Sequence, residues 1–303
     1  MSRPMTIALC TCNGMPWLPA QLDSLLAQGH KDWTLWVGDD GSSDGTLDCL
    51  AAFAAAHPGR LARIVAGPRR GSAANFLSLL CHPDFPPGPV ALCDQDDVWL
   101  PEKLGRAEAA LRGAGEAPAV WAARYLFCDE ALAHRRPSTL WPRPPSFGNA
   151  LVQNILSGHT LTLNAAALRL VRQAGVQDVP HHDWWIYQLM TGAGARVLQE
   201  PEPMLLYRQH GTNTVGAQRG LRARLSRLDW LFDGTYRGWN RRHLAALGRA
   251  RGSLSAPAAA VLDRWAGAET RMERLRLCLR LGLHRQSRAE TLALMAAILA
   301  DRA

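Results

Sequence analysis

The sequence predicts an α/β fold, with a mostly parallel sheet flanked by helices and a helical extension at the C-terminal end. Strand-like apolar segments alternate with helix-like segments, in units of about 30 residues, over the first two thirds of the chain. Hydrophobic residues make up 48% of the 303 residues, which is enough for a substantial core. Strand-like segments then stop, and only helical periodicity continues. We therefore expect two regions, 1–215 and 216–303.

The first expected strand, 6–12, is an unbroken apolar run. The helix after it, 17–28, has Pro19 near its start and leucines along one face. Three more strand and helix pairs repeat this order. The expected strands are 34–40, 62–67 and 90–94, and the expected helices are 44–56, 72–80 and 102–115. The helix 44–56 ends at His57, Pro58 and Gly59, a group of residues typical of helix ends.

The pattern is less regular after residue 118. Segments 119–129, 160–164, 195–200 and 203–210 are each predicted to be a strand. The Pro-rich stretch 136–145 separates two of them, and it is either a ligand-facing loop or a solvated connector.

Two helical stripes follow residue 215. The first consists of Leu221, Leu225, Leu228 and Phe232. The second is predicted to form one amphipathic helix, because its apolar residues recur at spacings of four and three: Val261, Trp265, Ala268, Met272, Leu275 and Leu279.

The net charge of +8 is unevenly distributed. Residues 1–215 contain 17 Lys and Arg against 19 Asp and Glu, whereas residues 216–303 contain 17 against 7. This asymmetry predicts a domain boundary near residue 215 and an anionic partner for the basic region. Its helices form either a docked bundle with a solvated basic surface or a surface that also contacts anionic lipid headgroups.

The seven cysteines are scattered without a CxxC pair, which argues against a disulfide framework or a zinc ribbon. No leader with a cleavage site is evident, and no apolar run approaches the roughly 18–20 residues of a membrane span. We therefore expect a cytoplasmic protein whose cysteines are mostly small core residues.

Acidic clusters end two of the expected strands, at 38–46 and 93–97. Carboxylates packed this closely raise one another's pKa, so they indicate a nearby cation. Asp94 and Asp96 are suited to one hard divalent ion. The sequence lacks the Gly and Glu spacing of an EF-hand, a GxGxxG fingerprint and a P-loop, so these site types are excluded.

The segments "TCNG", "LPAQLDSLLAQ", "TLWVGDDGSSDGT" and "CDQDDVWLPEKL" occur in this order. Together they resemble the inverting glycosyltransferases of family 2, which have the GT-A fold, over residues 5–215. "CDQDDVW" and "YRQHGTN" are most similar to rhamnosyltransferase-type members that build bacterial surface polysaccharide.

The resemblance implies a metal site for Mn²⁺ or Mg²⁺. Asp94, Gln95 and Asp96 match the family's Asp-x-Asp motif, which binds the metal and the donor diphosphate. It implies that Asp96 is the direct ligand, that Asp94 lies near the ribose and the metal, and that His210 completes the site. It gives no role to Asp97, which we expect to brace the turn towards Pro101.

The resemblance also implies a donor site and a catalytic base. Thr11, Asn13 and Asp40 are expected near the nucleotide base. Arg70, Gly71 and Asn75 are expected to close over the donor. Cys12 departs from the family's usual aromatic residue beside the base.

Asp183 matches the family's catalytic base, while His182 stands where the family usually has Glu. The implied acceptor-side residues are Gly158, His159, His182, Trp184 and Trp185.

By this resemblance the chain transfers a sugar, with rhamnose from dTDP-rhamnose as the first expectation and UDP-sugars as the second. The acceptor would be a lipid-linked saccharide, which would bring region 216–303 to the inner face of the cell membrane. The alternative is a non-catalytic scaffold that keeps the fold. We do not expect a nucleic-acid partner, because the basic helices lack an aromatic stacking platform.

Overall fold

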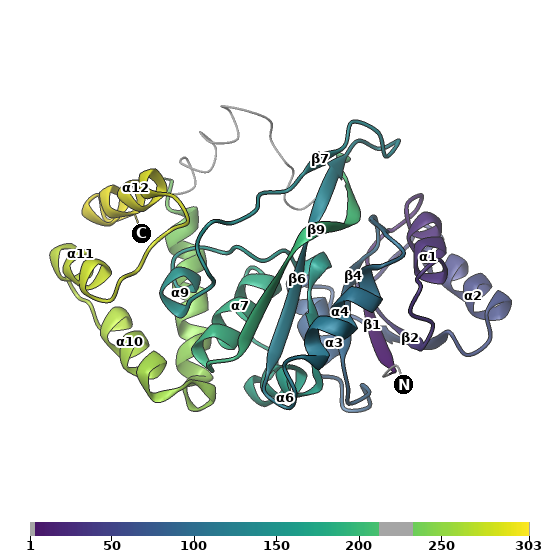
Figure 1. The fold of residues 1–303 in the computed structure, drawn as a ribbon, viewed down its shortest axis with the longest axis horizontal. Helices are drawn as coiled ribbons and strands as arrows, with labels where there is room; N and C mark the ends of the chain where they lie inside the picture. The colour runs from purple at the N-terminus through teal and green to yellow at the C-terminus, as the bar shows by residue number, and fades with distance from the viewer. Residues whose placement is uncertain (1–3, 212–232, 303) are drawn as a thin grey trace.

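The computed structural model describes residues 4–211 and 233–302. Within them, nine strands form one sheet in the order β3-β2-β1-β4-β8-β6-β9-β5, with β7 paired to β6 (Figure 1). Helices cover both faces of this sheet, which confirms the predicted α/β architecture. The boundary expected at residue 215 and the stripe 221–232 lie outside the described residues.

The first half of the sheet is parallel. Its strands are β1 (Met5–Thr11), β2 (Trp33–Asp39), β3 (Leu61–Ala66) and β4 (Val90–Asp94). The connecting helices are α1 (Leu18–Leu26), α2 (Thr46–Ala56) and α3 (Ser72–Leu80), and α4 (Lys103–Arg112) follows β4. Each matches an expected element to within a few residues, because each apolar run is bounded by Gly, Pro or Ser.

The second half of the sheet is mixed. β6 (Ala119–Cys128) pairs in parallel with β9 (Arg196–Arg208), and β8 (Thr162–Leu163) joins β4 to β6 by antiparallel pairing. Two-residue strands add to it at β5 (Val98–Trp99) and β7 (Arg136–Pro137). The helical segments here are α5 (Phe147–Ala150), the 3-10 turn η1 (Gly158–Thr160), α6 (Ala165–Ala174) and α7 (His182–Gly192).

Two strands were expected where the structure has the single strand β9. Its pairing with β6 shifts register between Ala123 and Arg124, where Glu200 and Pro203 are the successive partners. Proline has no N–H for the ladder, so Pro201 and Pro203 produce an irregularity. The strand continues beyond them because pairing resumes at Leu206.

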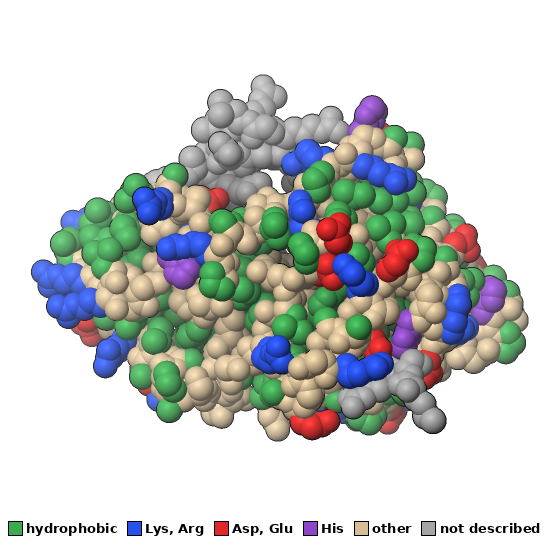
Figure 2. All heavy atoms as spheres, viewed as in Figure 1, with side chains coloured by type: hydrophobic (Ala, Val, Ile, Leu, Met, Phe, Trp, Pro, Cys, Tyr) green, Lys and Arg blue, Asp and Glu red, His purple; other side chains and the backbone are tan. Residues whose placement is uncertain are grey.

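The C-terminal helices are α9 (Thr235–Arg249), α10 (Ala256–Ala266), α11 (Arg271–Arg280) and α12 (Arg288–Leu299), with a short turn η2 (Arg251–Ser253) after α9. Residues 233–302 carry 13 Arg against 6 Asp and Glu. Basic side chains gather on the end of the molecule formed by these helices, at the left of Figure 2.

The prediction of one amphipathic helix over 261–279 is wrong. α10 ends before Gly267, and Thr270 starts α11 by accepting a hydrogen bond from the backbone N–H of Glu273 at 3.1 Å. The break turns the second half of the stripe outwards, so that Met272 is 47% and Leu279 60% exposed.

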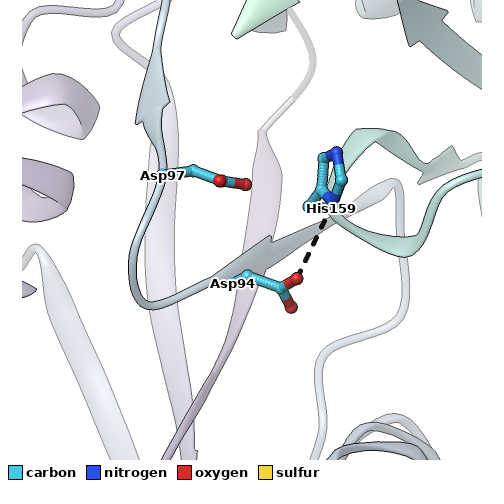
Figure 3. Close-up of side chains that lie close together, drawn as sticks. All are labelled: Asp94, Asp97 and His159. Atoms are coloured by element: carbon cyan, nitrogen blue, oxygen red, sulfur yellow. Dashed lines mark ion pairs between the residues drawn. The ribbon is translucent and has the colours of Figure 1, made fainter. Parts of the chain in front are cut away.

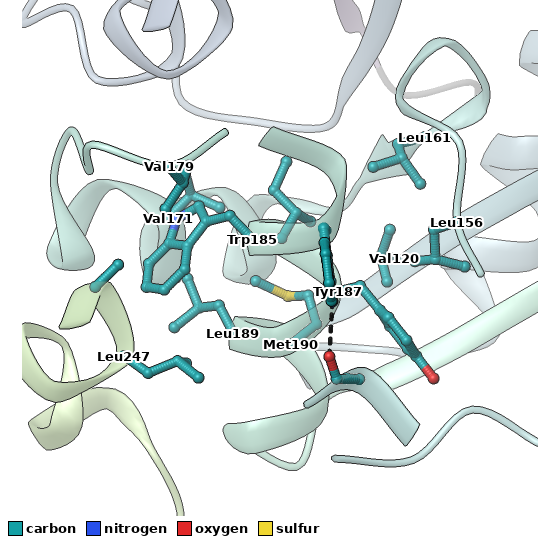
Figure 4. Packing of buried hydrophobic residues seen from close by; sticks show 14 of the residues in the cluster. Val120, Leu156, Leu161, Val171, Val179, Trp185, Tyr187, Leu189, Met190 and Leu247 are labelled. Carbon is teal, nitrogen blue, oxygen red and sulfur yellow. Dashed lines mark hydrogen bonds between the residues drawn. The ribbon is translucent and has the colours of Figure 1, made fainter. Parts of the chain in front are cut away.

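A single hydrophobic cluster joins the sheet to the C-terminal helices. It includes Phe76 of α3, Trp185 of α7, Leu247 of α9 and Ile298 of α12, all buried. Figure 4 shows side chains of α7 packed between the sheet side and Leu247. α7 is therefore held from both sides. Among the described helices, none has the length and apolar character to cross a bilayer.

Candidate active site

The carboxyl ends of β1, β2 and β4 meet at one edge of the sheet, where Thr11, Asp39 and Asp94 end their strands. Thr11 Oγ1 donates a hydrogen bond to Asp39 Oδ1 at 2.9 Å, and the backbone N–H of Ser42 donates to Asp39 Oδ2 at 2.9 Å. Burial alone would raise the pKa of Asp39, but these hydrogen bonds lower it below the ordinary value. The ionised carboxylate of Asp39 thus stabilises the turn after β2.

Gln95 holds the loop after β1. Its Oε1 accepts from the backbone N–H of Cys12 at 2.8 Å, and its Nε2 donates to the carbonyl of Cys12 at 3.1 Å. On the same loop, Asn13 Oδ1 accepts from the N–H of Ser43 at 2.8 Å. The residues predicted to lie near the nucleotide base are therefore close together, on loops joined by the hydrogen bonds of Gln95 and Asn13.

Asp40 holds the loop 69–71 by hydrogen bonds. Its two carboxylate oxygens accept hydrogen bonds from the backbone N–H groups of Arg69 at 2.6 Å and Gly71 at 2.8 Å. The predicted donor-closing segment therefore does lie beside Asp40. Arg70 itself pairs with Asp178 at 3.1 Å, away from this contact.

Asn75 makes a contact that the sequence did not indicate. It is 2% exposed, and its amide donates to the carbonyl of Gly38 at 2.7 Å. In the structure it therefore joins α3 to β2, and its expected role towards a donor stays a prediction.

Asp94, Asp97 and His159 form the densest cluster of metal-binding groups among the described residues (Figure 3). One ligand atom of each lies within 4.8 Å of the others, and Asp94 Oδ2 is 3.7 Å from His159 Nδ1. Burial would raise the pKa of Asp94, but the facing His159 ring lowers it. Burial would lower the pKa of His159, yet the charges of Asp97 and Asp94 raise it. Asp94 and His159 therefore favour each other's charged form.

Asp97 was expected only to brace a turn. It is fully buried, and neither of its carboxylate oxygens has a hydrogen-bond partner in the described structure. Burial raises its pKa well above the ordinary value. Nearby Lys103 is also fully buried with its ammonium over the ring of Trp99 at 3.3 Å, and burial lowers its pKa to about 7. The sequence predicted neither the burial of Asp97 nor that of Lys103, and the third acid of "DQDD" was the only signal for the first.

Asp96 and His210 form a second pair, with Asp96 Oδ2 and His210 Nε2 2.8 Å apart. The His210 ring stacks on Trp17, with centroids 5.2 Å apart. Burial and the charge of Asp94 raise the pKa of Asp96. Two predicted metal ligands that lie 114 positions apart in the sequence are thus in contact.

Asp183 lies in the first turn of α7, half-buried. Its Oδ2 accepts from the backbone N–H of Gly158 at 3.2 Å, and its Oδ1 accepts from the N–H of Trp184 at 2.7 Å. The neighbouring His182 stacks on Phe76 at 4.2 Å, and burial lowers its pKa despite the opposing charges of Asp183 and Asp94. Asp183 therefore faces the same edge as the acidic cluster.

The interpretation of Trp184 and Trp185 as acceptor-side rings requires correction. Trp185 is fully buried and Trp184 is 4% exposed, and both belong to the hydrophobic core. The indole N–H of Trp184 donates to the carbonyl of Ala150 at 2.7 Å. At consecutive positions of a helix enclosed on both sides, neither ring presents a face to solvent.

The donor set fits a hard divalent cation. Asp94, Asp97 and His159 bring two carboxylates and an imidazole together, and the contacting pair Asp96 and His210 offers a third carboxylate and a second imidazole. Buried carboxylate oxygens without partners are costly to the fold, and a bound cation offsets that cost.

Known proteins resemble this chain in sequence and in structure. The family model described as "Glycosyl transferase family 2" matches residues 6–174. The chain is 26% identical over 250 residues to the dTDP-rhamnosyl transferase RfbG of Shigella flexneri, a match that covers 76% of this chain and 81% of that protein.

Two solved structures share the fold. The structure of Staphylococcus aureus TarS 1–349 in complex with UDP-GlcNAc superposes with a TM-score of 0.55 at 14% identity, covering 93% of each chain. The mannosyltransferase PcManGT of Pyrobaculum calidifontis, in complex with GDP-Man and Mn²⁺, gives a TM-score of 0.54 at 19% identity, covering 99% of this chain and 86% of its own.

Proposed function

The chain belongs to glycosyl transferase family 2 and is a glycosyltransferase, and from this premise we propose that it moves a sugar from a nucleotide-sugar donor to a saccharide acceptor, with inversion at the anomeric carbon. The observation that carries the proposal is the position of Asp183. Its carboxylate is held by Gly158 at the sheet edge where the Asp94, Asp96 and Asp97 carboxylates gather.

Asp183 is the general base in this proposal. It takes the proton from the acceptor hydroxyl while that oxygen bonds to the anomeric carbon, and the bond from that carbon to the donor diphosphate breaks. One oxygen of Asp183 is oriented by Gly158, the other by Trp184. These two N–H donors favour the ionised carboxylate and fix its direction.

Asp94 would hold the divalent cation, Mn²⁺ or Mg²⁺, together with the contacting pair Asp96 and His210. Asp97 and His159 offer further ligand atoms within 4.8 Å of one on Asp94. The cation supplies charge stabilisation for the departing diphosphate. The Mn²⁺ named for PcManGT and the unpartnered buried oxygens of Asp97 support this assignment.

The proposed donor is dTDP-rhamnose, with UDP-sugars as the second choice. The name of RfbG supports rhamnose, and the UDP-GlcNAc complex of TarS supports the alternative. Thr11, Asn13 and Asp40 lie on the fastened loops at the base side, as expected for a nucleotide.

We propose a lipid-linked saccharide of surface polysaccharide as the acceptor, with the chain at the inner face of the cell membrane. α11 combines arginines with the exposed Met272 and Leu279, a composition suited to anionic headgroups. Changing Arg276 and Arg280 to Glu should abolish binding to phosphatidylglycerol vesicles. Unchanged binding would contradict the membrane contact.

The deciding experiment incubates the full chain with Mn²⁺, a saccharide acceptor and each nucleotide sugar in turn. Asp183→Asn should reduce transfer by about 10³-fold while donor-induced thermal stabilisation persists. Asp48→Asn, an exposed acid in the first turn of α2, is the matched control and should be fully active. Full activity of Asp183→Asn would refute the mechanism, and no binding of any nucleotide would favour a scaffold role.

A further inference from the structure

Asp178 forms ion pairs with two arginines, Arg70 and Arg242. The three residues come from three separate segments of the described structure. Asp178 Oδ1 lies 3.1 Å from Arg70 Nη2, on the loop that Asp40 holds, and 2.8 Å from Arg242 Nη2, on α9. One carboxylate therefore faces two guanidinium groups, which leaves an excess positive charge. The three side chains are 60%, 65% and 45% exposed respectively.

The group lies beside the proposed base. Asp178 precedes α7 by four residues, and Asp183 is in the first turn of that helix. The ring of His181 packs edge-to-face against Trp239 of α9, with centroids 4.7 Å apart. Burial lowers the pKa of His181, with the charge of Asp183 opposing and that of Arg242 adding to this shift. Both charges therefore act on one ring.

The face of α9 that meets α7 buries two polar side chains among its apolar ones. His243, next to Arg242, is fully buried against Trp184 with ring centroids 4.7 Å apart, and Asn240 is 5% exposed. Arg242 thus projects from a packed section of helix. The backbone position of Arg242 is therefore held by the buried residues beside it, which limits where its guanidinium can reach.

We propose that Arg242 and Arg70 form a subsite for a phosphate group of the acceptor. This inference rests on the proposed function and deepens it by naming the chemistry of the second substrate. Exposed ion pairs contribute little stability, so both arginines can exchange Asp178 for a ligand at small cost. A phosphate offers several oxygens to two planar guanidinium groups, whereas Asp178 gives both the same oxygen.

The position favours the acceptor over the donor. The donor diphosphate belongs with the carboxylate cluster, whereas Arg242 comes from α9, and its charge acts on the same His181 ring as the charge of Asp183. An acceptor that carries a phosphate near its reacting hydroxyl would reach both Arg242 and the base.

The test compares Arg242→Gln with Arg241→Gln, its exposed neighbour on α9. Three acceptors with the same terminal sugar are used: a prenyl diphosphate-linked saccharide, a lipid-free saccharide phosphate and a neutral alkyl glycoside. Arg242→Gln should raise KM about tenfold for one or both phosphate-bearing acceptors and leave KM unchanged for the neutral acceptor and the donor. A response to the prenyl compound alone assigns the phosphate to the lipid linkage, and a response to both assigns it to the saccharide phosphate as well. Equal effects on the charged and neutral acceptors would overturn the proposal.

A binding measurement separates this proposal from the proposed function. Calorimetry in EDTA, without donor, measures the affinity for the same prenyl diphosphate-linked saccharide. Arg242→Gln should weaken it about tenfold, Arg241→Gln should not, and Asp178→Asn should strengthen it because the competing carboxylate is removed. If the three variants show these affinities but no nucleotide sugar supports transfer, the proposed function is wrong and the phosphate subsite stands. Binding indifferent to all three changes would remove the subsite.

Discussion

Replacing Gly158 with alanine tests how closely the base is held. Gly158 contributes space as well as its N–H bond to Asp183. A Cβ at this position would overlap Nε2 of His182 and lie 2.8 Å from its Cε1. His182 has little room to retreat, because its ring is 8% exposed and stacks on Phe76 at 4.2 Å. The substitution must therefore move either the ring or the turn that holds Asp183.

The expected effect on activity is larger than the effect on stability. Overpacking in a well-packed core costs about 1–3 kcal/mol, which this chain should tolerate as a folded protein. A displacement of the base by about 1 Å is expected to reduce transfer by about 100-fold. Gly158→Ala should therefore unfold at a modestly lower temperature and transfer sugar about 100-fold more slowly.

A double substitution identifies the cause. His182→Ala removes the ring that the new methyl group would strike, so Gly158→Ala with His182→Ala should be at least about tenfold more active than Gly158→Ala alone. Initial rates of transfer and thermal unfolding of all four proteins complete the cycle. Wild-type activity of Gly158→Ala, or no recovery in the double variant, would refute the steric reasoning.

Three further predictions concern stability, metal and helix capping. Burial lowers the pKa of His243 from 6.5 to about 3. Below pH 6.5 the unfolded chain therefore binds a proton at His243 that the folded chain does not bind. The free energy of unfolding falls by about 2 kcal/mol at pH 5 for this reason. Denaturant titration of His243→Leu at pH 7 and pH 5 should lack this loss, and an unchanged pH dependence would contradict the assignment. Asp97→Asn should raise the unfolding temperature in EDTA, because it removes a buried unpaired carboxylate, and should shrink the stabilisation by Mn²⁺; an undiminished Mn²⁺ effect would place the metal elsewhere. Thr270→Ala should cost about 1 kcal/mol in denaturant titration through loss of the α11 cap, with transfer unaffected; a loss within error would show that the cap contributes nothing.

The parallel half of the fold was predictable because its signals are local. The apolar runs that became β1, β2 and β4 stop at Gly, Pro or Ser, and each helix between them carries its own apolar face. Where a local signal conflicted with distant pairing, the prediction failed. Pro201 and Pro203 suggested two strands, but pairing with β6 on both sides of them makes one.

The candidate site was predictable only in part. Asp96 and His210 were assigned together because both belong to recognisable motifs, and they are in contact. The approach of His159 to Asp97 depends on how η1 packs against β4, and nothing near either residue encodes it. The burial of Trp184 and Trp185 was equally hidden, since it requires α9 to cover the outer face of α7.

That covering sets an order in which the molecule can be completed during synthesis. The ribosome releases Asp183 and the carboxylate cluster well before the residues of α9, yet Leu247 of α9 and Ile298 of α12 belong to the same core cluster as Trp185 of α7. Until these helices emerge, the nascent chain presents the apolar outer side of α7 to solvent, and chaperones bind such surfaces. The helix that carries the base therefore gains its full packing only after α9 and α12 have been translated, so that a chain cut short before α9 would hold the acidic motif and lack a fixed base.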